Sequence, residues 1–404
     1  MVMFSLVKSV PRAAKQTLSQ GEVSMYVIVA PQPLKGSLTA AEAGQAIALG
    51  VCAVFPEAHV DIIPVADGGD GTVHALVEAR KGEIVSHTVT GPLGEPVSAF
   101  YGLLDNGYTA IIEMAASSGF LLVPPERRDP RITTTYGVGE LILDALDRGC
   151  RRIIIGLGSS ATNDGGAGMA QALGISLQTE DGTAVARGGA ALASLACISL
   201  ANLDSRLRQC TIEVASDVTI PLCGLTGASV LFGPQKGATP EMVMQLDSAL
   251  DHYAQIIERD IGINVRDSPG AGAAGGLGAA LIAFVHATIH SGAYMILEAF
   301  QFEEKAKHAD LVITAEGQID TQTALGKSLS VVAHLAKRHQ LPVLALSGNL
   351  GENYTCAYDV GIDAIMPLAP GPITQAYSVT HAGKLMLAAT ERALRILRIG
   401  KSLQ

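Results

Sequence analysis

The chain has 404 residues, a length with room for two or three domains. With 48% hydrophobic and only 16% charged residues, its composition fits α/β layers. Its net charge of −10 is spread without blocks, and no basic stripe could follow a phosphate backbone, so the sequence predicts no nucleic-acid partner. No apolar run approaches the roughly 18 residues of a membrane span, and six widely spaced cysteines indicate reduced thiols in a cytoplasmic protein.

Residues 1–24 are basic, with a single acid at Glu22, and precede the first predicted strand. Their composition is compatible with a targeting segment, a disordered extension, or sequence translated ahead of a start at Met25. We interpret them as a disordered N-terminal extension that lies outside the fold.

The first part of the chain alternates strands and helices. The pattern predicts strand, helix, strand and helix in turn over 26–30, 40–55, 60–65 and 73–80. Thr39 and Glu42 form a capping box at the start of the first helix. Three consecutive strands follow, and they are predicted over 84–90, 96–103 and 109–113. Because a meander replaces the alternation there, we place a domain boundary near residue 88.

The central part mixes both kinds of element. Strands are predicted from Ile153 and over 211–215, and helices over 138–148, 240–259 and 273–290. His286 and His290 are four residues apart on the last helix, a zinc-like spacing without further ligands nearby. After residue 297 alternation returns, with strands over 311–314, 343–347 and 362–366 and helices over 328–338 and 376–397.

These elements predict an α/β fold of two domains. Residues 25–88 and 297–404 would build one doubly wound parallel sheet, and residues 89–296 would form an inserted second α/β domain. A cleft between two such domains is a preferred place for a ligand.

Five glycine-containing loops follow strands or precede helices, at 31–37, 66–72, 156–168, 232–239 and 315–327. Together they supply lysines, carboxylates and exposed backbone N–H groups, which are what phosphoryl transfer needs. The acidic 66–72 loop could also be an ordinary solvated turn, but its two carboxylates among glycines favour a Mg²⁺ site. The loop 156–168 lacks the full dinucleotide fingerprint.

From these residue types we predict roles at a phosphoryl-transfer site. Asp67 or Asp164 would accept the hydroxyl proton of the substrate. Mg²⁺ would be held by carboxylates drawn from Asp67, Asp70, Asp217, Glu316 and Asp320. The phosphates and the transferred group would meet Lys35, Lys236, Lys327, Gly165 and Gly166. The substrate would contact Ser160, Thr162, Asn163, Asp164 and one of Arg127 and Arg128.

Several long stretches give the chain a specific resemblance: VADGGDGTV (65–73), IEMAASSG (112–119), RDPRITTTYGVGELI (128–142), IIIGLGSSATNDGGAGMAQALG (153–174), FGPQKGATPEMV (232–243), PGAGAAGGLGAAL (269–281) and LVITAEGQIDTQT (311–323). With them the chain resembles the bacterial glycerate kinases, which phosphorylate D-glycerate with ATP, from about Met25 to its end. The resemblance implies that the discontinuous domain is flavodoxin-like, that the active site lies between the domains, that Mg-ATP is the donor, and that 2-phosphoglycerate is the expected product.

The chain also departs from the pattern of the family it resembles. Gln32 and Pro33 stand where such kinases usually have an acid and a hydroxyl, and Gln318 stands where they have an arginine. Smaller departures are Ser159 for glycine, Ser216 for cysteine and Asp70 for glutamate. Two alternatives therefore stay open beside an active kinase: an impaired relative that binds glycerate or nucleotide, and an α/β oxidoreductase. The sequence leaves open a homo-oligomer and the choice between 2- and 3-phosphoglycerate.

Overall fold

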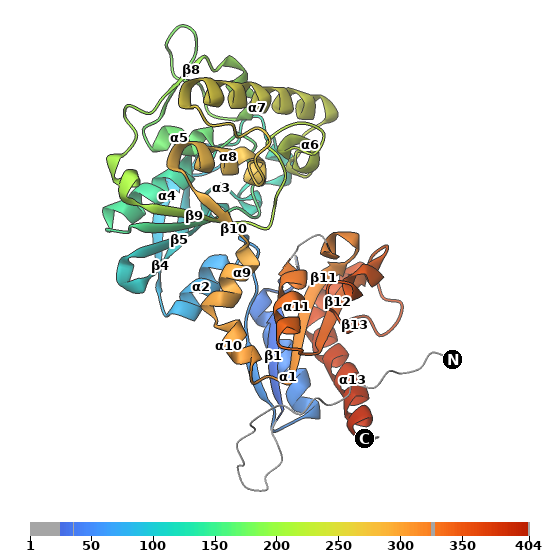
Figure 1. Cartoon of the computed structure of the whole chain (residues 1–404). Coiled ribbons are helices and arrows are strands. Elements are labelled where there is room, and N and C mark those ends of the chain that lie inside the picture. The colour runs from blue at the N-terminus through green and yellow to red at the C-terminus, as the bar shows by residue number, and fades with distance from the viewer. Residues whose placement is uncertain (1–24, 35, 325–327, 403–404) are drawn as a thin grey trace.

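The computed structural model describes residues 25–34, 36–324 and 328–402, and its first sheet has five parallel strands (Figure 1). The strand order is β2-β1-β11-β12-β13, which in chain order is 2-1-3-4-5, the flavodoxin-like arrangement. Its strands are β1 (Tyr26–Pro31), β2 (His59–Ile62), β11 (Leu311–Ile319), β12 (Val343–Leu350) and β13 (Ala364–Pro367). The predicted doubly wound sheet, built from both ends of the chain, is therefore confirmed.

The second sheet has the strand order β10-β9-β6-β5-β4-β3. Its strands are β3 (Glu83–Thr90), β4 (Pro96–Leu104), β5 (Thr109–Glu113), β6 (Arg152–Gly156), β9 (Thr211–Ala215) and β10 (Thr288–His290). The first three pair antiparallel, as the predicted meander requires, whereas β5, β6, β9 and β10 run parallel. The carboxyl ends of these four strands consequently share one edge. A separate hairpin pairs β7 (Ser176–Gln178) with β8 (Cys197–Ser199).

The α-helices pack on both faces of both sheets. They are α1 (Ala40–Val54), α2 (Thr72–Arg80), α3 (Ala115–Ser118), α4 (Tyr136–Asp147), α5 (Ala167–Ala172), α6 (Ala228–Phe232), α7 (Pro240–Ile261), α8 (Ala273–Val285), α9 (Gly292–Ala299), α10 (Phe302–Ala306), α11 (Ser328–Arg338), α12 (Gln375–Thr380) and α13 (Ala382–Ser402). No helix within the described ranges combines the length and the apolarity that a membrane span requires.

The alternation of side chains along β1 divides the first sheet between two cores. Val27 and Val29 face α1 and α13, whereas Ile28 and Ala30 face the opposite core. That opposite core also contains residues of α2, α9, α10 and α11 and, from the second sheet, Ile154. A strand buried on both faces is what the unbroken aliphatic sequence of a parallel sheet indicates.

Helices α2 and α9 form the layer between the two sheets (Figure 1). On α2, Val73 and Leu76 are fully or almost fully buried in this shared core, and so is Ile296 of α9. The other face of the second sheet, with Ile153 and Ile155, packs on a separate core that includes α4, α5, α7 and α8. The two sheets are thus joined by one continuous apolar layer.

The structure corrects several sequence-based expectations. The helix predicted over 273–290 ends at Val285, and His286 adopts a left-handed conformation while His290 lies in β10, so the two histidines do not form a helical pair. The residues that start α8 are themselves left-handed at 274–276. The C-terminal helix is divided into α12 and α13.

The predicted domain boundaries fall inside secondary-structure elements. Residue 88 lies within β3, all of which pairs with β4 in the second sheet, and residue 297 lies within α9. Sheet membership changes between β2 and β3 and again between β10 and β11. The division at residues 88 and 297 stays a prediction, and residues 1–24 lie outside the described residues.

The capping box of α1 yields a test of local stability. Thr39 Oγ1 accepts the Glu42 N–H at 3.2 Å, and Glu42 Oε2 accepts the Thr39 N–H at 2.8 Å. We expect Thr39→Ala to lower the free energy of unfolding by about 1 kcal/mol, because one N–H of the first turn loses its acceptor. Urea denaturation measures this, and Thr39→Ser, which keeps the oxygen, should restore most of the loss.

Candidate functional site

The candidate site is built where the carboxyl edge of the second sheet meets the loop that follows β2. The segments that leave this edge carry Glu113 at the end of β5, Gly158 after β6, Asp217 after β9 and Ser291 after β10. Residues 67–71, here called the acidic loop, come from the first sheet and lie against these segments. The side chains that leave one edge are thereby brought to one place, as predicted for parallel strands.

Glycines make this contact possible because backbone lies directly on backbone. The Gly158 N–H donates to the Gly68 carbonyl at 3.0 Å. A Cβ on Gly68 would lie 1.9 Å from the Ala215 carbonyl oxygen, and one on Gly156 would lie 2.3 Å from the Gly68 carbonyl oxygen. Gly68 also has a φ of +88°, which side chains rarely adopt. The acidic loop can therefore be seated here only if these positions have no side chain.

The packing of the acidic loop against the second sheet brings two carboxylates together, those of Asp67 and Asp217. Gly292 contacts the backbone of Asp67 and also stabilises the Asp217 carboxylate through its N–H. Asp217 Oδ2 accepts Ser328 Oγ at 3.1 Å, while its buried Oδ1 has no partner among the described residues. Burial raises the pKa of Asp217, and the nearby charge of Asp67 acts in the same direction. Asp67 itself is exposed.

The other predicted metal ligands lie apart from this pair. Asp70 Oδ2 accepts Ser159 Oγ at 2.8 Å. Glu316 accepts Thr323 Oγ1 at 3.3 Å, and Asp320 accepts the Gln318 amide at 2.7 Å, both near the carboxyl end of β11. In the described part of the chain no three or more His, Cys, Asp or Glu residues are grouped to hold a metal ion.

The loop after β6 supplies the predicted substrate residues, but most of them face inward. Ser160 pairs with Gly119 in an isolated β-bridge. Thr162 and Asn163 are fully buried, and Asn163 donates its amide to Ser229 Oγ at 2.9 Å. Thr162 Oγ1 and Asn163 Oδ1 have no partner among the described residues. A buried polar atom without a hydrogen-bond partner lowers the stability of the fold, so an ordered water or a bound group is expected to bind these two atoms.

Asp164 is fully buried and holds the loop in place. Its Oδ2 accepts the Thr135 N–H at 2.8 Å and Thr135 Oγ1 at 2.9 Å, and also the Gly168 N–H at 3.2 Å. Its Oδ1 accepts the Gly166 N–H at 3.1 Å, and the Gly165 N–H donates to the Gly275 carbonyl at 3.0 Å. These N–H groups therefore serve the protein itself, and burial raises the pKa of Asp164.

Lys236 is also buried, with only 2% of its surface exposed. Its Nζ donates to the Thr162 carbonyl at 2.6 Å. Burial lowers the pKa of Lys236 to about 7, and the nearby Asp164 opposes this shift. The ammonium group is thus directed at the loop after β6 rather than at solvent, where a nucleotide phosphate would arrive.

The two candidate arginines have different surroundings. Arg127 is exposed and forms an ion pair with Glu95 at 3.0 Å. The Arg128 guanidinium lies 3.6 Å from the centre of the Phe120 ring, and its Nε donates to the Val123 carbonyl at 3.3 Å. Phe120 donates its N–H to Ser159, which places Arg128 beside the loop after β6. Lys35 and Lys327 lie outside the described residues.

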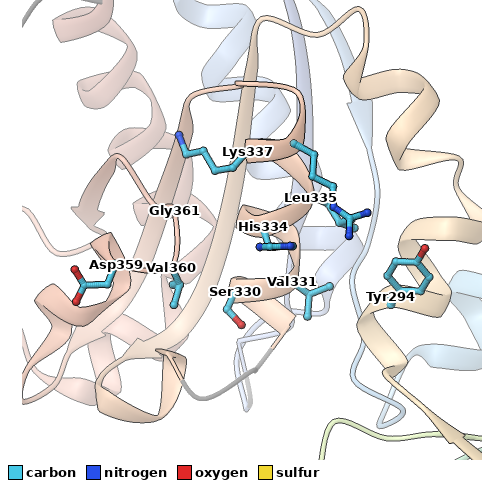
Figure 2. Close-up of a pocket in the computed structure, with 10 residues that line it drawn as sticks. Tyr294, Ser330, Val331, His334, Leu335, Lys337, Asp359, Val360 and Gly361 are labelled. Carbon is cyan, nitrogen blue, oxygen red and sulfur yellow. The ribbon is translucent and has the colours of Figure 1, made fainter.

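Two surface hollows have linings that do not include Asp67 or Asp217. One runs along α11 between Tyr294 of α9 and Asp359, and is lined by His334 and Arg338 (Figure 2). The other is lined by residues near β7, among them Gln171. Neither is lined by a residue to which the sequence assigned a role, and the predicted interdomain cleft stays a prediction.

Three residues that are distant in sequence support the site by direct contact, and the sequence did not identify them. Glu113, Thr135 and Ser328 contact the first turn of α2, Asp164 and Asp217 respectively. Each comes from an element far away in the chain, so spacing could not reveal it. For Glu113 one signal existed, because a lone acid ends an otherwise apolar strand at the carboxyl edge of a parallel sheet.

The fold is that of a two-domain α/β protein, and the family model that matches the chain is one of kinases. A model of the "Glycerate kinase family" matches residues 27–398. The chain is 48% identical to the glycerate kinase of Bacillus subtilis over 94% of this chain and 99% of that protein. It is 49% identical to the glycerate 2-kinase of Escherichia coli over 84% of this chain and 90% of that protein. The chain therefore belongs to the glycerate kinase family.

A solved structure agrees with this assignment. The crystal structure assigned as glycerate kinase 2 from Salmonella typhimurium LT2 superimposes with a TM-score of 0.78 and is 46% identical in sequence. The match covers 94% of this chain and all of that one. The relation therefore includes both sheets rather than the flavodoxin-like part alone.

The glycine contacts predict which residues of the acidic loop tolerate a side chain. We expect Gly68→Ala to lower the free energy of unfolding by about 3 kcal/mol or more, because Cβ would overlap the Ala215 carbonyl. Gly71→Ala is the matched control, since Gly71 also has a positive φ but open space around it, and should cost about 1–2 kcal/mol. Equal losses in denaturant unfolding would contradict the packing argument.

Lys236 predicts a pH-dependent stability. Because its folded pKa is near 7 and its ordinary value is 10.5, the unfolded chain binds more protons between these pH values. Stability contributed by neutral Lys236 is therefore present at high pH and lost as pH falls towards 7. Relative to Lys236→Met, the wild type should gain up to about 4 kcal/mol from pH 7 to 10. Unfolding of both proteins across this range, with exposed Lys384→Met as control, measures the difference.

Proposed function

We propose that this kinase transfers the terminal phosphoryl group of ATP to the 2-hydroxyl of D-glycerate with the help of Mg²⁺. The observation that carries the proposal is the pair formed by exposed Asp67 and half-buried Asp217 at the junction of the two sheets, in which the buried Oδ1 of Asp217 lacks a partner among the described residues. Membership of the glycerate kinase family supports glycerate as substrate. The name of the Escherichia coli relative, glycerate 2-kinase, supports the 2-hydroxyl.

The residues at the junction fit Mg²⁺ better than a metal that needs a complete protein cage. Mg²⁺ is usually held by one or two carboxylates, together with phosphate oxygens and water. Asp217 offers a carboxylate oxygen that has no hydrogen-bond partner among the described residues, and Asp67 adds a second negative charge beside it. When bound, Mg²⁺ would neutralise charge on the phosphates. In this proposal Asp217 is the principal protein ligand, and Asp70, Glu316 and Asp320, which lie apart from it, are not assigned to the metal.

Asp67 is proposed to accept the proton of the glycerate 2-hydroxyl as the new O–P bond forms. It is exposed, so a substrate can reach it, and its backbone is fixed by the seating of Gly68. Asp164 is not assigned this task in the proposal, because both its oxygens already accept hydrogen bonds from Thr135, Gly166 and Gly168. Asp164 and Lys236 instead hold the loop that carries Thr162 and Asn163.

Arg128 is proposed to bind the carboxylate of glycerate. Its guanidinium is stacked on Phe120, which restricts its orientation, and among the described residues only its Nε is used, by the Val123 carbonyl. The two terminal nitrogens can therefore form the paired hydrogen bonds that a carboxylate accepts. Lys35 and Lys327, which follow β1 and precede α11 in the sequence, are proposed to meet the phosphates.

One observation favours the impaired relative as a second candidate. The Gln32 amide nitrogen is buried without a partner among the described residues, at the end of β1 beside the switch point of the first sheet. If an acid is needed at this position, activity would be low in the wild type and would rise in Gln32→Asp. An inactive wild type that still binds ATP or glycerate would favour this candidate.

The proposal is tested by measuring ADP formation with purified protein, ATP, Mg²⁺ and D-glycerate, with the product identified by ³¹P NMR. We expect turnover that requires Mg²⁺ and yields 2-phosphoglycerate. Absence of turnover above background would overturn the kinase proposal for glycerate, and 3-phosphoglycerate as product would overturn the assignment of the 2-hydroxyl.

Two variants separate the proposed roles. Asp67→Asn should lower kcat by about 10²–10⁴-fold, because the proton acceptor is lost. Arg128→Lys should raise the KM for glycerate by roughly tenfold with a smaller effect on kcat, since a point charge replaces a planar pair of donors. Arg127→Lys is the matched control and should change neither constant appreciably. A KM effect of Arg127→Lys equal to that of Arg128→Lys would exchange their roles.

A further inference from the structure

Glu113 is a buried carboxylate of the second sheet whose partners lie on a helix that follows the first sheet. It ends β5, and only 3% of its surface is exposed. Its Oε1 accepts the Val73 N–H of α2 at 2.7 Å. The N–H groups of Gly71 and Thr72 also favour its charged form. The Thr72 N–H also donates to the Gly69 carbonyl at 3.2 Å, so the Val73 N–H is the group that Glu113 binds directly at the start of α2.

Helix α2 has no cap of its own. Its N-cap residue is Gly71, which has a φ of +95° and no side chain to accept the free N–H groups of the first turn. Such groups normally require an acceptor, and a carboxylate at a helix N-terminus is a favourable one. Glu113 supplies this acceptor across a sequence separation of 40 residues.

This contact completes the attachment of the acidic loop to the second sheet. Ahead of α2, Gly68 is held by the Gly158 N–H, and Asp70 accepts Ser159 Oγ. Behind the loop, Glu113 holds the first turn of α2. Both ends of the five-residue segment that carries Asp67 and Asp70 are thus fixed to the carboxyl edge of β5 and β6, although the segment follows a strand of the first sheet.

We propose that Glu113 is a positioning residue of the kinase, which sets the place of Asp67 opposite Asp217 by anchoring α2 and the acidic loop to the second sheet. Glu113 does not touch substrate in this proposal and acts through the backbone of residues 71–73. The inference rests on the proposed function in one respect, because it assumes that Asp67 and Asp217 are the working carboxylates. The anchoring itself is independent of that assumption.

The test compares Glu113→Gln with the wild-type enzyme. Glutamine keeps the shape but replaces one acceptor oxygen with an amide donor that faces backbone N–H groups. We expect kcat to fall roughly tenfold or more with little change in the KM for glycerate, because Arg128 is not moved. We also expect faster amide hydrogen exchange in residues 67–77, and a several-fold weaker binding of Mn²⁺ together with ATP in calorimetry. Glu113→Asp, one methylene shorter, should give intermediate values.

The matched control is Glu140→Gln. Glu140 Oε2 accepts the Thr90 N–H at 2.6 Å, so it is also a carboxylate that anchors a backbone N–H of the second sheet, but it does not contact the acidic loop. We expect this variant to lose thermal stability by an amount similar to Glu113→Gln while kcat, metal binding and exchange in residues 67–77 stay at the wild-type values.

The outcomes distinguish this inference from the proposed function. Unchanged exchange in residues 67–77 of Glu113→Gln would overturn the anchoring. Faster exchange with kcat and Mn²⁺ binding unchanged would show that Glu113 merely caps a helix, and would overturn the positioning role. If the wild type does not phosphorylate glycerate, the proposed function fails, and Mn²⁺–ATP binding together with exchange still decides whether Glu113 positions the carboxylates.

Discussion

The structure depends on one close contact, in which the loop that leaves the first sheet lies backbone to backbone against the carboxyl edge of the second. Gly68 lies against the Ala215 carbonyl and accepts the Gly158 N–H, and any side chain at Gly68 or Gly156 would separate the two surfaces. Helices α2 and α9 continue this contact as an apolar layer shared by both sheets. The place of Asp67 is therefore decided by the second sheet rather than by the first.

The polar residues around this contact divide into those that hold it and those that face a ligand. Asp164, Lys236 and Glu113 are buried, and each is hydrogen bonded to backbone of a loop or helix end. Asp67, Asp217 and Arg128 keep atoms that the described residues do not use, or are exposed. This division suits phosphoryl transfer, where catalysis depends mainly on positioning and charge, and it agrees with membership of the glycerate kinase family.

Much of the fold could be predicted because it depends on local signals. Short windows of sequence show the Thr39 capping box, the β-branched strands and the meander that ends at Glu113. The alternation of strands with helices indicated the parallel sheet built from both ends of the chain. The helix expected over 273–290 was wrong only in part, because it begins at Ala273 but ends at Val285. Alanine and glycine favour helix locally, yet residues 274–276 are left-handed where Gly275 and Gly276 lie against the loop around Gly165. Tertiary contact outweighed propensity there.

The sequence alone determined the chemical groups available and the loops in which lysines, carboxylates and glycines lie, since these follow from residue type and spacing. Its family resemblance implied that the discontinuous domain is flavodoxin-like. Only the tertiary structure decided which of those groups are used internally. Asp164 was predicted to contact substrate and Lys236 to contact phosphate, yet both are buried, where Asp164 binds Thr135 and Lys236 binds Thr162. The role of Glu113 becomes visible only in the structure, where the end of β5 lies against the start of α2. Burial and hydrogen-bond partners are set by segments distant in sequence, which no local pattern contains.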